Sequence, residues 1–118
     1  MLRRFPKRNS LQGRLILIVQ RRWIIARTLA VAFEARGAEV VMVKYSLSDL
    51  ANLPNLSAGV LDSASRDLRR ELKAKGIPFV LYTARERPDD APIIRKPAPA
   101  ADVVARVEEL LTHDHGAA

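Results

Sequence analysis

Four polar positions, each at or near the end of a run of apolar residues, are the ones in this sequence best suited to chemistry. They are Gln20-Arg21, Asp62, Thr83 and Lys96. A carboxylate can act as a nucleophile, and a hydroxyl and an ammonium group beside it can stabilise the negative charge that such a reaction develops. If the fold brings these residues together, they form a candidate site centred on Asp62.

The apolar runs alternate along the chain with segments of helical periodicity. The runs predict strands over 15–19, 38–43, 58–62, 77–82 and 93–95. Apolar residues at helical spacing predict helices over 23–36, 46–53, 65–75 and 100–111, and Gly37 and Gly76 are placed to end two of them. This alternation predicts an α/β fold, a doubly wound five-stranded parallel sheet whose first and third strands are adjacent and central. Since ligands bind at the carboxyl ends of the strands in such sheets, the four polar groups should meet at one edge.

The positive charge of the chain is concentrated at one end. The sequence has 118 residues, the size of one domain, and a net charge of +7. Residues 1–22 contain seven Lys and Arg and no acid, whereas the remainder is balanced. We predict a basic flexible arm over 1–13, one domain over 14–111 and a flexible tail over 112–118.

Several classes of site and protein are excluded by composition. The chain has no cysteine, so disulfides and thiolate chemistry are absent, and both histidines, His113 and His115, fall in the predicted tail. The glycines form neither a dinucleotide-binding nor a P-loop motif. No apolar run approaches the roughly 18 residues that span a bilayer. We therefore expect a cytoplasmic protein that does not bind membranes and is not an enzyme.

The order and placement of five segments resemble the receiver domain of two-component response regulators, in its single-domain form. The segments are 14–19, 35–40, 60–62, 76–83 and 95–97, and the resemblance extends over residues 14–111. It implies a flavodoxin-like, receiver-like sheet. It also implies that Asp62 is the phosphoacceptor for a histidine kinase. Thr83 would then supply the hydroxyl that follows the phosphoryl oxygens, and Lys96 the ammonium that pairs with them.

The sequence departs from the receiver pattern in two places. The family holds Mg²⁺ with an acidic pair after the first strand, and here Gln20 and Arg21 stand at those positions. Because Mg²⁺ takes oxygen ligands and a guanidinium cannot ligate it, we predict that Mg²⁺ binding is lost, that no cofactor is needed and that phosphorylation is weak. Only 12 residues separate Thr83 from Lys96, which predicts a shortened region between the fourth and fifth strands.

These observations predict a degenerate, pseudo-receiver module of a phosphorelay signal transduction system that acts through protein–protein contact. Its partner would be a histidine kinase or another signalling protein, and its oligomeric state stays open. The alternative is a small nucleic-acid-associated α/β protein that uses its basic arm, although nucleic acid is not the partner we expect.

Asp62 and its neighbours also allow a simpler interpretation. Asp62 can be a turn acid or helix cap, Lys96 a surface lysine, and Arg21 a solvated loop residue. Against this, neighbouring strands lie about 4.8 Å apart, a gap that an arginine side chain spans. We predict that the guanidinium of Arg21 pairs with Asp62 and fixes the site in one state.

Overall fold

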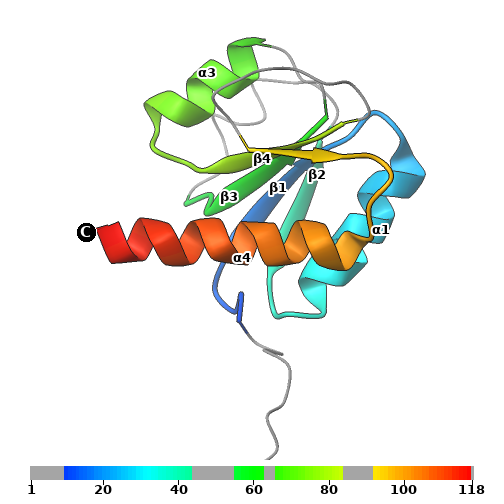
Figure 1. The fold of residues 1–118 in the computed structure, drawn as a ribbon, viewed down its shortest axis with the longest axis horizontal. Coiled ribbons are helices and arrows are strands. Elements are labelled where there is room, and N and C mark those ends of the chain that lie inside the picture. Colours follow the sequence, from blue (N-terminus) through cyan, green and yellow to red (C-terminus); the bar gives the residue numbers. More distant parts are fainter. Residues whose placement is uncertain (1–9, 44–54, 63–65, 84–91, 118) are drawn as a thin grey trace, which may run out of the picture.

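The computed structural model describes residues 10–43, 55–62, 66–83 and 92–117. Strands and helices alternate over most of this length, as Figure 1 shows. The strands are β1 (Leu15–Val19), β2 (Glu39–Val43), β3 (Ala58–Leu61), β4 (Phe79–Thr83) and β5 (Ile93–Arg95), and the helices are α1 (Trp23–Glu34), α3 (Arg66–Ala74) and α4 (Ala100–Ala117). None of the helices in these ranges is long and apolar enough to cross a membrane.

The five strands form one parallel sheet in the order β2-β1-β3-β4-β5. This confirms the predicted fold class and the adjacent, central placement of the first and third strands. In register, Val19 pairs with Leu61 of β3, and Leu61 pairs with Leu81 of β4. The residues that follow these strands therefore lie along one carboxyl edge.

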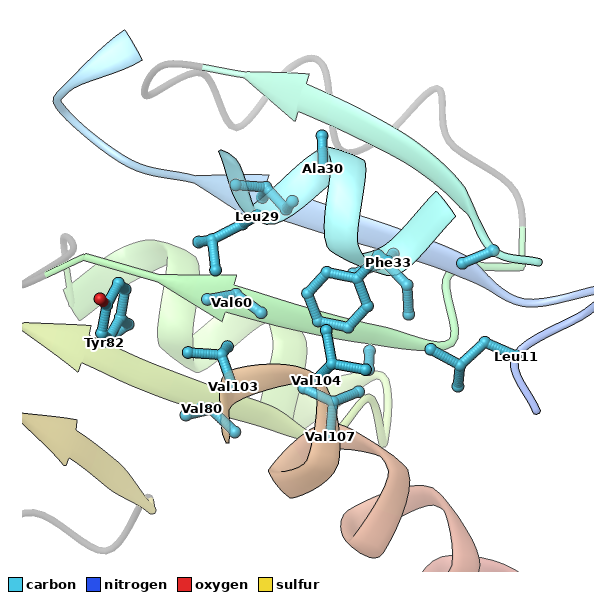
Figure 2. Close-up of a cluster of buried hydrophobic side chains, with 14 of the residues drawn as sticks. Leu11, Leu29, Ala30, Phe33, Val60, Val80, Tyr82, Val103, Val104 and Val107 are labelled. Atoms are coloured by element: carbon cyan, nitrogen blue, oxygen red, sulfur yellow. The ribbon is translucent and has the colours of Figure 1, made fainter. Parts of the chain in front are cut away.

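Two apolar layers cover the two faces of the sheet. Alternate strand residues such as Ile18 and Val60 pack against α1 and α4, whereas Leu17 and Leu61 face α3. Figure 1 shows α3 on one side of the sheet and both other helices on the opposite side. Figure 2 shows the larger cluster, where Phe33 of α1 lies among side chains of α4 and the strands. The continuous burial of the central strands explains why their sequences are aliphatic without alternation.

The ends of the domain differ from the predicted boundaries. We expected the arm to reach residue 13, but Leu11 is buried in the larger core cluster and its N–H donates to the Arg36 carbonyl (2.9 Å). We expected the last helix to end at Leu111, where its apolar stripe ends, but α4 continues to Ala117. At the point where the apolar stripe ends, the Thr112 hydroxyl donates to the Glu108 carbonyl (2.9 Å), one turn earlier. The rest of the arm, the predicted helix over 46–53 and most of the shortened region before β5 lie outside the described residues.

Gly37 ends α1 in the left-handed region, with φ of 94°, as its place after the helix predicts. A Cβ on Gly37 would lie 3.2 Å from the backbone of Gln12, whereas one on Gly76, with φ of 72°, would meet open space. Both Gly→Ala substitutions should cost about 1–2 kcal/mol for the left-handed conformation, and Gly37→Ala should cost more because Gln12 must also move. Urea denaturation of the two variants measures the difference. Equal losses would mean that the segment around Gln12 gives way freely.

Candidate functional site

Two predicted site residues, Gln20 and Asp62, and one unpredicted residue, Tyr82, come together where the central strands end. Gln20 and Asp62 each follow the paired residues Val19 and Leu61, and Tyr82 is the next residue after Leu81 of β4. This register places Gln20, Asp62 and Tyr82 in one row across three neighbouring strands. The ladder continues at this point, because the Asp62 N–H donates to the Val19 carbonyl (2.8 Å).

The Asp62 carboxylate contacts a cation from the segment after β5 and a hydrogen-bond donor from the end of β1. The Lys96 ammonium lies 3.6 Å from Asp62 Oδ1, and the Arg21 backbone N–H donates to Asp62 Oδ2 (3.2 Å). The side chains of Asp62 and Lys96 are 14% and 17% exposed. A pair at this depth is screened less by solvent than a surface pair. Donors from the end of β1 and from the segment after β5 thus hold the charged carboxylate.

Lys96 itself is fixed by β4. Its backbone N–H donates to the carbonyl of Thr83 (3.0 Å), which continues the β4–β5 pairing by one residue. Its ammonium also lies 5.3 Å from the centre of the Tyr82 ring, within the range of a cation–π contact. Thr83 is 2% exposed and stands at the carboxyl end of β4, as the sequence predicts. The strand pairing therefore gathers the predicted acid, hydroxyl and ammonium residues at one edge.

The backbone of Arg21 contacts Asp62. The residue as a whole is exposed, and its N–H is the donor to the carboxylate. The predicted pair between the guanidinium and Asp62 stays a prediction. What the sequence could indicate was the proximity of the two strand ends, because register sets it; which atoms of Arg21 make the contact depends on the local turn into α1.

Gln20 is 3% exposed, and neither polar atom of its side-chain amide has a hydrogen-bond partner among the residues that the structure describes. A buried amide without partners costs free energy that an apolar side chain of similar length does not. The row at the end of the central strands therefore carries a polar residue that folding alone does not favour.

An exposed apolar surface on α1, which we name the α1 face, was not predicted. Trp23, Ile24 and Val31 are 62%, 66% and 56% exposed, and Arg27 lies 5.6 Å from the centre of the Trp23 ring. The signal in the sequence was that these apolar residues fall outside the core stripe of the same helix, which contains Leu29, Phe33 and neighbouring buried positions.

A groove beside the α1 face, which we name the α1 groove, reaches the segment after β5. Its volume is about 130 Å³. Ile24 belongs to both features, so the groove and the exposed face are continuous. The lining consists of Ile24, Ile25, Thr28, Leu29, Tyr82, Ala98 and Ala100. An apolar surface that ends in a small groove can accept an inserted side chain.

Comparison with known proteins gives a consistent fold. No family model and no curated protein sequence matches the chain. A receiver domain protein (CheY-like) from Methanospirillum hungatei is 20% identical with a TM-score of 0.73, covering 89% of this chain and 98% of its own. A response regulator from Thermotoga maritima is 17% identical with a TM-score of 0.71 and coverages of 84% and 98%. The receiver domain of a histidine kinase from Syntrophus aciditrophicus is 21% identical with a TM-score of 0.72 and coverages of 86% and 92%.

Proposed function

We propose, for a chain with the fold of response regulator receiver domains, a signalling role through contact with another protein. In this role Asp62 is a weak or vestigial phosphoacceptor, and the protein has no enzymatic activity of its own. The observation that carries the proposal is the α1 face, an exposed apolar surface continuous with the α1 groove, which Tyr82 lines.

Among the residues that the structure describes, the donors around Asp62 do not fit Mg²⁺, the ion that the resemblance to receivers implies. Mg²⁺ requires oxygen ligands in near-octahedral geometry, usually with one or two carboxylates. Asp62 is the one carboxylate of its row and already lies 3.6 Å from the Lys96 ammonium. Gln20 offers a single amide oxygen, and the guanidinium of Arg21 offers none. We propose that the protein works without a metal, so that phosphorylation of Asp62 lacks its main neutralising charge.

The α1 face supports protein contact because it combines exposed apolar area with an aromatic residue. Ile24, Thr28 and Val31 recur at helical spacing along one line of α1. Ile24, Val31 and the nearby Trp23 are large apolar side chains exposed to water, and exposed apolar patches and tryptophan are enriched where partners bind. A partner helix laid along this line would place one of its side chains in the α1 groove.

The charges around the α1 face indicate the chemistry of the partner. Arg21, Arg22 and Arg27 are all exposed toward the N-terminal end of α1, and the first turn of this helix contains no acid. A second copy of this chain would bring like charges together, which disfavours self-association through this face. We propose that the partner is a signalling protein whose contacting helix has apolar residues flanked by Asp and Glu.

A photo-crosslinking experiment tests the proposed function. A benzophenone amino acid replaces Val31 on the α1 face, or Lys73 on α3 as the matched control, in cells that naturally contain the protein. We expect a crosslink to a histidine kinase or another phosphorelay protein from position 31, at least tenfold stronger than from position 73. Adding Ile24→Glu should reduce it at least tenfold, because the carboxylate enters the apolar groove.

The same experiment distinguishes the alternative. Equal crosslinking from the two positions, or capture of nucleic acid in place of a protein, would contradict the proposal. Binding to nucleic acid through the basic arm would also weaken steeply between 50 and 200 mM salt, whereas an apolar contact would not.

A further inference from the structure

Tyr82 touches both the charged site and the α1 groove. Its side chain is 6% exposed and lies next to Asp62 in the row across β3 and β4. Figure 2 shows Tyr82 at one end of the larger core cluster, with Leu11 near the other end. The same residue lines the α1 groove. One buried side chain therefore borders both the charged site on Asp62 and the α1 groove.

On the side of the charged site, Tyr82 shares Lys96 with Asp62. The Lys96 ammonium lies 3.6 Å from a carboxylate oxygen and 5.3 Å from the centre of the Tyr82 ring. Both attractions act on the same cation, and the carboxylate contributes the larger one because it carries a full charge. When the carboxylate loses its charge, the stronger of these two attractions on the ammonium weakens, so we expect the ammonium to shift over the ring.

On the side of the groove, the Tyr82 hydroxyl holds the backbone of Ala98. It donates to the Ala98 carbonyl (2.8 Å) and accepts from the Ala98 N–H (3.3 Å). Ala98 lines the α1 groove and stands just before α4. The Tyr82 hydroxyl thus holds the Ala98 wall of the α1 groove, while the Lys96 ammonium lies over the ring of the same side chain.

We propose that Tyr82 is a positioning residue that couples the charge of Asp62, through Lys96, to the Ala98 wall of the α1 groove. A change in the negative charge at Asp62 moves the ammonium over the ring, and the hydroxyl carries the change to Ala98. The inference rests on the proposed function, because only a groove that binds a partner makes the coupling useful. It assigns to β4 a role that its position in the core alone does not require.

Amide NMR of the protein by itself tests the coupling with four forms: wild type, Asp62→Asn, Tyr82→Phe and the double variant. Asn keeps the shape of Asp62 without its charge, and Phe keeps the ring of Tyr82 without its hydroxyl. We expect Asp62→Asn to shift the amide resonances of Ala98 and Thr28. In the Tyr82→Phe background the same change should shift them at least threefold less.

The Arg21 amide is the internal control, because it donates directly to Asp62. It should shift equally in both backgrounds. Shifts of equal size at Ala98 in both backgrounds would overturn the proposal, since they would show that the effect runs along the backbone from Lys96 through Pro97. No shift at Ala98 on Asp62→Asn in the wild-type background would overturn it as well.

A second variant keeps the test decisive if Tyr82→Phe does not fold. Lys96→Met removes the cation but leaves Tyr82 and its two hydrogen bonds intact. It should abolish the response of Ala98 to Asp62→Asn while the response of Arg21 persists, and a retained response at Ala98 would contradict the coupling. These measurements need no partner, so their failure is distinct from a failure of the crosslinking experiment.

Discussion

The double substitution Gln20→Asp and Arg21→Asp is expected to raise the affinity for Mg²⁺ with beryllofluoride, a mimic of an aspartyl phosphate, about 100-fold, or about 2.7 kcal/mol. The reason is the change in donors beside Asp62: two carboxylates take the place of a buried amide and a guanidinium. Titration followed by Trp23 fluorescence measures it, since this exposed side chain lies two residues from Arg21.

The matched control is Gln20→Asn with Arg21→Asn, which removes the guanidinium without adding an acid. This control should gain little affinity, and Asp62→Asn should abolish binding in every background. Without metal, the acidic variant should also unfold at a lower temperature than wild type, because three carboxylates crowd one edge, and Mg²⁺ should reverse the loss. Tight binding by the wild-type protein would contradict the proposed absence of a metal site.

Phe33→Ala is expected to lower the free energy of unfolding by about 3–5 kcal/mol. Phe33 is fully buried, and Figure 2 shows it beside Val104 and Val107 of α4. Removing the ring leaves a cavity where α1, α4 and the sheet meet. A loss of this size is a large part of the total stability of a small domain.

Val31→Ala is the control on the same helix, because Val31 is 56% exposed. Its effect should stay within about 0.5 kcal/mol, as for other surface substitutions. Urea denaturation of both variants gives the comparison. If Val31→Ala were as costly as Phe33→Ala, the α1 face would be part of the core and unavailable to a partner.

The sheet and the meeting of the site residues could be predicted from sequence because both follow from local patterns. Buried aliphatic runs indicate strands, and parallel strands bring Asp62 and Lys96 to one edge whatever their side chains do. The role of Tyr82 could not be predicted, since an aromatic residue at the end of a buried strand reads as core. Its hydroxyl meets Ala98 only because the segment after β5 turns back over β4.

The burial of Leu11 and the end of α4 could not be predicted for a related reason. Leu11 is a single apolar residue among polar neighbours, and no periodicity marks it as part of the core. Its burial depends on α4 and on the end of α1, which are distant in the sequence. At the other end, the apolar stripe of α4 stops at Leu111, but a helix needs no buried face to continue for another turn and a half. In both places the apolar pattern indicates which residues are buried periodically, but it does not indicate where the ordered chain or the helix ends.

The strand order also sets the sequence in which the protein can fold. β1 pairs with β3, and Ile16 aligns with Ala58, so the central pairing must wait until more than 40 residues of chain have been closed into a loop. Lys96 and α4 come later still, and α4 covers Val60 and its neighbours on one face of the sheet. A chain growing on the ribosome would therefore hold this face of the sheet uncovered until α4 emerges. Uncovered apolar surface of this kind favours aggregation, so the interval before α4 docks is when aggregation competes with folding.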